Sequence, residues 1–284
     1  MAKGGALQSA WPLHTGVLDP QGPIGAAERT ILLNATAIML AVIVPVIVLT
    51  LVFAWWFRSG NRRAHYLPDW SYSGRIELVT WSIPALVIMF LGGIAWISAH
   101  DLDPPVPIRS AVTPVDIEVV SLDWKWLFIY PDQALAGVNR LVVPAGTPIR
   151  FRLTSATVMN SFFVPQLGSQ IYTMPRMTTR LNLQADRPGT YHGLSAQFSG
   201  DGFSDMRFDV VALAPDAFKE WVTATRASGG RLDATRYGQL AQPGTLATPA
   251  TFGSVAPQLF EAVVMGDATT TGPSSGESSP HSGN

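Results

Sequence analysis

Four side chains between residues 191 and 206 stand where a copper-binding loop would need its ligands. Ser195 and Ser199 are four residues apart, and Phe203 and Met206 follow them. A binuclear copper site of this spacing requires two thiolates, an imidazole and a thioether, because soft sulfur and imidazole donors hold copper. A serine hydroxyl is protonated at neutral pH and a phenyl ring has no lone pair to donate. The loop therefore has the spacing of a copper site without its donors, apart from Met206.

The composition is that of a chain partly embedded in a membrane. Of the 284 residues, 47% are hydrophobic and only 14% are charged, and there is no cysteine. A disulfide and a cysteine-ligated metal are both excluded. The net charge of −1 gives no reason to expect nucleic acid as a partner.

Two uncharged runs predict a transmembrane hairpin over residues 31–98. The first, residues 31–57, could reach ~40 Å as a helix, which exceeds the ~30 Å hydrocarbon core of a bilayer. The second follows Glu77, so we expect the spans to be 31–57 and 77–98, joined by a loop over 58–75. The alternative for each run is a buried core helix, which such long uncharged runs disfavour.

The distribution of charge predicts the orientation of the hairpin. The loop is rich in arginine, whereas Asp101 and Asp103 follow the second span directly. By the positive-inside rule the loop is cytoplasmic, and both termini, including an external N-terminal segment over 1–30, are outside. Met1 is followed by a polar stretch and not by a cleavable signal. Either the sequence lacks the start of a precursor, or the N-terminal tail is exported with the first span.

The pattern changes after the second span to short segments of period two, broken by proline, glycine and aspartate. Such segments over residues 112–214 predict a β-sandwich or barrel. Residues 215–265 predict an arm that begins with an amphipathic helix over 216–227, and Phe252, Leu259 and Phe260 are candidate anchors on a neighbouring subunit. The tail over 266–284, rich in Gly, Ser and Thr, is expected to be disordered.

Several motifs carry a resemblance to a known family. Besides the loop, these are LDPQGPIG (18–25), ELVTWSIP (77–84), DWKWLFIYP (123–131) and VMNSFFVP (158–165). Together they resemble subunit II of the haem-copper respiratory oxidases, in the quinol-oxidising branch of cytochrome bo type. In the branch that oxidises cytochrome c, the loop carries Cys at Ser195, Glu at Gln197, Cys at Ser199, His at Phe203 and Met at Met206. An upstream His of that branch matches Asn160.

The resemblance implies an α+β membrane protein, in which the hairpin is followed by an all-β cupredoxin-like Greek-key sandwich and a C-terminal helical arm. It further implies subunit II of a proton-pumping ubiquinol oxidase in the bacterial inner membrane, with the β-domain in the periplasm. Subunit I would hold the haems and one copper, with subunits III and IV and membrane lipid as further partners. Ubiquinol would be the substrate of the complex. No cofactor, metal or catalytic centre is expected in this chain, and no cytochrome c docking.

Glu77 is the candidate for a functional role, because a carboxylate at the membrane edge is costly unless it is paired or hydrated. The resemblance places it near the entrance of a proton-uptake channel of subunit I; the alternative is a helix N-terminal acid. Trp124, Trp126 and Tyr130 alternate in a strand-like run. They are interpreted as packing or subunit-contact residues in preference to an electron relay.

Alternatives of other classes remain open at this point. One is a cytochrome c oxidase subunit with its own copper, which the lost donors argue against. Another is a stand-alone membrane-anchored cupredoxin-like module for binding or assembly. The histidines show no pair at metal-ligand spacing and are expected at surfaces or interfaces; they are His14, His65, His100, His192 and His281.

Overall fold

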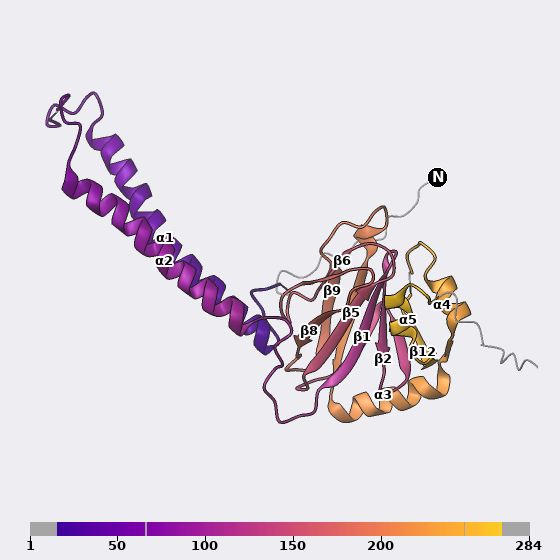
Figure 1. The fold of residues 1–284 in the computed structure, drawn as a ribbon. Helices are drawn as coiled ribbons and strands as arrows, with labels where there is room; N and C mark the ends of the chain where they lie inside the picture. The colour runs from indigo at the N-terminus through magenta and orange to yellow at the C-terminus, as the bar shows by residue number, and fades with distance from the viewer. Residues whose placement is uncertain (1–15, 66, 247, 269–284) are drawn as a thin grey trace, which may run out of the picture. The chain divides into compact units, whose positions relative to one another are not determined.

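A computed structural model describes residues 16–65, 67–246 and 248–268 (Figure 1). The chain divides into two units. Residues 27–103 form one, and the described residues before 27 and after 103 form the other. His14, His281 and most of the tail expected to be disordered lie outside the described residues.

Two long apolar helices make up most of the first unit. They are α1 (Pro23–Trp56) and α2 (Gly74–Asp101), and each contains one proline, Pro45 or Pro84. Both helices are long and apolar enough to cross a membrane, and the most apolar stretch of each is entirely unburied within the chain. This exposure argues against soluble core helices, because apolar side chains without protein neighbours require another apolar medium. The two expected spans are confirmed as helices, and each helix begins before the expected span.

The second unit is a sandwich of two sheets, as expected from the period-two segments. The larger sheet has the strand order β11-β12-β3-β2-β1-β5-β8, and the smaller has the order β4-β10-β9-β6-β7. Three of the neighbouring pairs, β1 with β5, β10 with β4 and β11 with β12, are parallel, which requires crossover connections and not tight hairpins. The strands of the sandwich are β1 (Val115–Leu122), β2 (Lys125–Tyr130), β3 (Leu135–Val138), β4 (Arg140–Pro144), β5 (Ile149–Ser155), β6 (Asn160–Phe163), β7 (Ile171–Thr173), β8 (Thr179–Leu183), β9 (Gly189–Ser195) and β10 (Arg207–Leu213).

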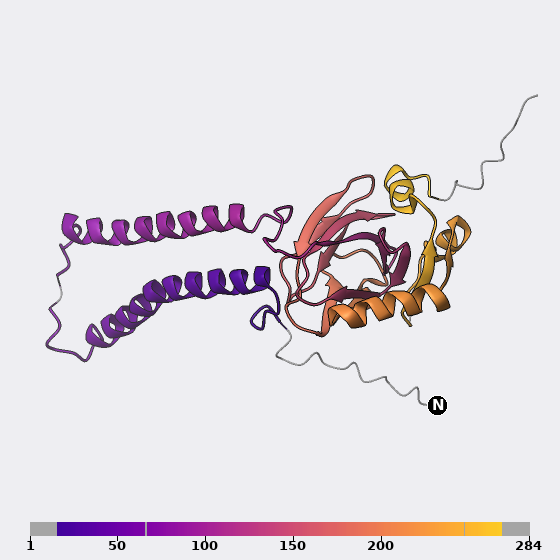
Figure 2. The same cartoon turned by 90° about the horizontal axis from the view of Figure 1, so that it is seen from below.

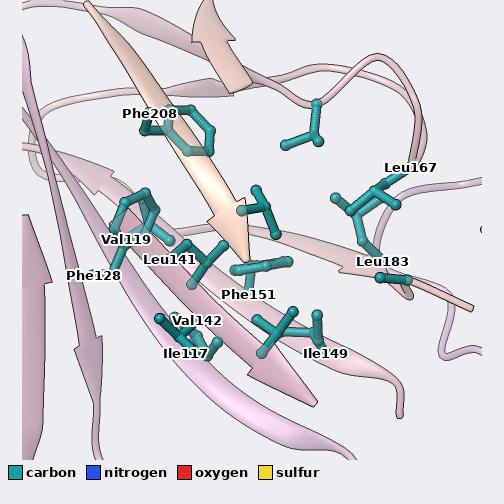
Figure 3. Packing of buried hydrophobic residues seen from close by; sticks show 14 of the residues in the cluster. Ile117, Val119, Phe128, Leu141, Val142, Ile149, Phe151, Leu167, Leu183 and Phe208 are labelled. Atoms are coloured by element: carbon teal, nitrogen blue, oxygen red, sulfur yellow. The ribbon is translucent and has the colours of Figure 1, made fainter. Parts of the chain in front are cut away.

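The main core fills the space between the two sheets. Figure 3 shows Phe128, Phe151 and Phe208 directed into this space from three different strands. The rings of Phe162 and Phe208 stack with centroids 5.0 Å apart. Alternate residues of each strand supply this core, because successive side chains of a strand point to opposite faces.

The C-terminal arm folds back onto the outer face of the larger sheet. It contains α3 (Pro215–Ser228), β11 (Gly230–Leu232), α4 (Ala234–Leu240), β12 (Ala250–Val255) and α5 (Leu259–Met265). Figures 1 and 2 show α3 crossing one end of the sandwich. The arm is therefore not purely helical, because β12 pairs with β3 and extends the sheet.

The arm also corrects the expectation of anchors on a neighbouring subunit. Leu259 and Phe260 are 4% and 1% exposed, and they pack in a second apolar cluster with Leu127 and Ile129 of β2. Phe252 is half-buried against the same cluster. These side chains are already buried in their own chain, so they have little surface left for another subunit.

A short N-terminal segment, which includes the first residues of α1, packs on the sandwich. The Gln21 N–H donates to the Gln166 carbonyl at 2.7 Å, and the Asp186 N–H donates to the Gln21 carbonyl at 2.8 Å. A Cβ on Gly22 would lie 2.1 Å from the Gln184 carbonyl oxygen, so only glycine fits there. Within the segment expected to be external, residues 16–26 thus belong to the β-unit, and α1 begins at Pro23.

Candidate functional site

The positions that match copper ligands come together at one end of the sandwich. Asn160 begins β6 and Ser195 ends β9, and these strands are paired, with Phe162 opposite Ser195. The Ser195 hydroxyl donates to the Asn160 side-chain oxygen at 3.1 Å, and both residues are almost fully buried. The two residues that the resemblance matches to a thiolate and an imidazole ligand thus share a neutral alcohol–amide hydrogen bond.

The remaining positions follow on the loop between β9 and β10. The Ser199 hydroxyl lies 3.9 Å from the sulfur of Met206, which is 1% exposed. Phe203 begins a short 3-10 helix, η1 (Phe203–Asp205), and its ring contacts that of Phe198. Gln197 is half-buried, and its backbone carbonyl lies 3.2 Å from the Ser195 hydroxyl. The structure therefore brings Ser195 to Asn160 and Ser199 to Met206, while Gln197 and Phe203 lie on the same loop.

Trp124 holds this loop in shape. It occupies the turn between β1 and β2 with a positive φ of 65°, and its indole N–H donates to the Ser199 carbonyl at 3.1 Å. A Cβ on Gly202 would lie 2.3 Å from the indole ring. The backbone of the loop therefore lies directly against the indole, a contact that glycine alone permits.

The donor set of the loop does not fit copper. Serine hydroxyls, an amide and a phenyl ring replace the thiolates and imidazoles that copper prefers, and Met206 alone retains a soft donor. Within the described residues, no group of three or more His, Cys, Asp and Glu side chains is placed to hold a metal ion. His192, on β9, instead pairs with Asp209 at 2.9 Å.

The three aromatic residues of the strand-like run have different environments. Trp126 and Tyr130 are fully buried, and Trp126 packs against the rings of Phe162 and Phe208. The Tyr130 hydroxyl donates to the Val142 carbonyl at 2.8 Å, and burial raises the pKa of Tyr130 above its usual range, so it stays protonated. As subunit contacts, Trp126 and Tyr130 have no side-chain surface to offer. Trp124, which is partly exposed, is the remaining candidate.

Glu77 lies in the first turn of α2. Its N–H donates to the Ser73 carbonyl at 3.0 Å, and its side chain is exposed. Within the part of the chain that the structure describes, the carboxylate makes no hydrogen bond or ion pair. This position agrees both with a helix-terminus acid and with a solvated proton acceptor.

Comparison with known proteins places the chain in a family. The family model for the periplasmic domain of cytochrome c oxidase subunit II matches residues 131–213, and the COX aromatic-rich motif matches residues 226–266. The cytochrome bo(3) ubiquinol oxidase subunit 2 of Pseudomonas aeruginosa is 49% identical over 86% of this chain and 74% of that protein. Its counterpart in Pseudomonas putida is 47% identical, over 87% of this chain and 79% of that protein. The ubiquinol oxidase subunit 2 of Acetobacter aceti is 45% identical over 93% of this chain and 87% of that protein.

The chain belongs to the ubiquinol oxidase subunit 2 family. The resemblance inferred from the motifs is therefore confirmed, as is the fold of an apolar helix pair followed by a cupredoxin-like sandwich. A ubiquinol oxidase subunit 2 is one part of an oxidoreductase complex and is not catalytic by itself. The apolar helices and the match to a periplasmic domain fit an inner-membrane protein.

The structure adds a feature of this chain that sequence reasoning missed. Arg152 of β5 donates to Glu118 of β1 at 3.0 Å and to Glu261 of α5 at 2.6 Å. Its guanidinium also lies 4.9 Å from the ring centroid of Phe260. Arg150 and Arg152 flank Phe151 in the sequence. The arm partner of Arg152, Glu261, lies 109 residues away along the chain, so no local pattern could have indicated it.

Proposed function

We propose that this chain is the copper-free subunit II of a proton-pumping ubiquinol oxidase. In this role, ubiquinol delivers its electrons to the catalytic subunit I without passing through a copper relay in subunit II. The observation that carries the proposal is the buried hydrogen bond between Ser195 and Asn160, at 3.1 Å. A copper site that relays electrons would lose its function with this donor set. A structural subunit would not, because its buried polar groups are hydrogen-bonded to each other.

The proposed partners follow from the same role. Subunit I would hold the haems and the oxygen-reducing copper, and subunits III and IV and membrane lipid would surround the hairpin. The arginines of the connecting loop favour a cytoplasmic loop, with both termini and the β-domain in the periplasm. No cytochrome c contact is required, because the electron donor is a quinol in the membrane.

Glu77 is proposed to assist proton entry to subunit I. Its carboxylate is exposed at the start of α2, next to the loop that carries the arginines. A carboxylate at the cytoplasmic membrane edge can collect protons from the bulk and pass them on through water. This role requires solvent access, which the exposed side chain supports.

The complex purified in mild detergent and washed with a copper chelator tests the proposal. We expect the chain to elute with haem, and to find copper only in proportion to the single copper of subunit I. Two further coppers per complex, together with a near-infrared mixed-valence absorption, would refute a copper-free subunit II. Elution of the chain without any haem would instead favour the stand-alone membrane-anchored module.

A further inference from the structure

Three methionines lie in two adjoining turns at the end of the sandwich where Asn160 begins β6. Met159 directly precedes β6, Met174 directly follows β7, and Met177 closes the turn that Met174 opens. We name them the methionine turns. They are separate from the loop described above, in which Met206 is buried.

The backbone brings these turns into contact. Strands β6 and β7 are antiparallel, with Asn160 opposite Thr173, so Met159 and Met174 are the next facing positions. Facing residues of such a pair have Cβ atoms about 4.5–5.5 Å apart. The Met177 N–H donates to the Met174 carbonyl at 3.4 Å, which closes the second turn. The three long, flexible side chains therefore begin close enough together for their sulfur atoms to reach a single ion.

Two of the three methionine side chains are exposed. Asn160 and Thr173 are 1% and 0% exposed, and the side chains that neighbour them along each strand point to the opposite face. Met159 and Met177 are 40% and 53% exposed, and Met174 is half-buried. The packing of the sandwich does not require the two exposed thioethers, of Met159 and Met177, so another role is more consistent with their placement.

The chemistry of the turns is selective for a soft cation. A thioether carries no proton to lose and is a ligand that favours Cu(I) over harder divalent ions. Residues 156–159 and 174–178 contain no Asp, Glu or His. One carboxylate from another element, that of Asp123, accepts from the Thr157 hydroxyl at 2.5 Å. The Arg176 guanidinium lies against the C-terminal end of α5, with its Nε 3.9 Å from where a Cβ on Gly266 would lie. Backbone carbonyls at a helix C-terminus favour a cation, which suits the Arg176 charge at this place.

We propose that Met159, Met174 and Met177 form a surface site for a monovalent copper ion. Binding involves no electron transfer and no bond cleavage, and the three sulfur lone pairs supply the coordination. The site is independent of the redox copper that subunit II is proposed to lack. Cu(I) has a filled d shell and gives no mixed-valence absorption, so the two proposals fail by different observations.

The test is an anaerobic Cu(I) titration of the chelator-washed complex against a competing Cu(I) chelator. The wild-type complex should hold one more chelator-exchangeable Cu(I) ion than the variant with Met159→Leu, Met174→Leu and Met177→Leu, with a sulfur-only first shell in X-ray absorption. Leucine keeps the volume of these side chains, so haem content should be unchanged. Because thioethers do not titrate, the binding should persist under mildly acidic conditions.

Met206→Leu is the matched control, because Met206 lies at the same end of the sandwich but is buried. This variant should bind the extra ion as the wild type does. The proposal is overturned if the triple variant binds Cu(I) as the wild type does, or if Met206→Leu abolishes the binding. It is also overturned if the triple variant loses its haem-bearing partner, since the methionines would then be a subunit contact.

Discussion

Phe260 is the side chain through which the arm can be tested most directly. It is 1% exposed on α5 and packs with Leu127 and Ile129 on the outer face of the larger sheet. The guanidinium of Arg152 lies over its ring. Phe260→Ala would remove the ring from this cluster and leave a cavity between the arm and the sheet.

The expected effect follows from its complete burial. Replacing a buried phenylalanine by alanine costs about 3–5 kcal/mol, because transfer free energy and packing are both lost. If this loss falls on the arm, its opening free energy decreases by the same amount. A decrease of about 3 kcal/mol raises the population of the open arm roughly 100-fold.

Hydrogen exchange of the purified complex, read by mass spectrometry, measures this opening. Peptides that cover β12 and β2 should exchange about 100-fold faster in Phe260→Ala. Met265→Ala is the control, because Met265 lies on the same helix and is 69% exposed; its effect should stay within about 0.5 kcal/mol. Unchanged exchange, accompanied by loss of the haem-bearing partner, would show that Phe260 anchors a neighbouring subunit and that the arm packing described above is wrong.

Three further predictions concern single positions and the copper loop. Glu77→Ala should leave assembly intact and slow quinol oxidation, most strongly at alkaline pH where protons are scarce. A helix-terminus acid would instead cost about 0.3–1 kcal/mol of stability and leave turnover unchanged. Burial raises the pKa of Glu118 above its ordinary value of 4.5, against the opposing effect of Arg152, so the folded state holds this proton more tightly than the unfolded state. This contribution to stability is present below about pH 4.5 and is lost as the pH rises through the raised pKa. The urea midpoint of Glu118→Gln should therefore lack this part of the pH dependence. A Glu118→Gln variant whose midpoint follows the same pH profile as the wild type would count against this prediction. Restoring the copper-branch residues at the five altered ligand positions, with Met206 kept, should let the full chain take up two coppers in a thiolate-bridged site; a variant that stays colourless with excess copper would mean that the loop geometry has diverged. The residues introduced are Asn160→His, Ser195→Cys, Gln197→Glu, Ser199→Cys and Phe203→His.

The local patterns of the sequence were sufficient for the elements themselves. Uncharged runs predict α1 and α2 because a bilayer core admits only long apolar helices. Period-two segments predict strands such as β5 and β10, and the spacing of Phe218 and Val222 predicts α3, in which both are buried. The ends of the helices were less well predicted: α1 begins at Pro23 and α2 at Gly74. Hydrophobicity defines what fits a membrane but does not determine where the backbone stops being helical.

The chemistry of the copper loop was also readable from residue types, because a missing thiolate is missing in any fold. Only the tertiary structure could show that Ser195 and Asn160, which are 35 residues apart, share a hydrogen bond. Similarly, β2 is buried on both faces, because the distant arm covers the face that a sandwich normally leaves to solvent. The sequence by itself therefore determined the local elements and the available donor atoms, which depend on neighbouring residues and side-chain chemistry. Which surfaces are covered, and by which distant segment, was decided by long-range packing that no local pattern encodes.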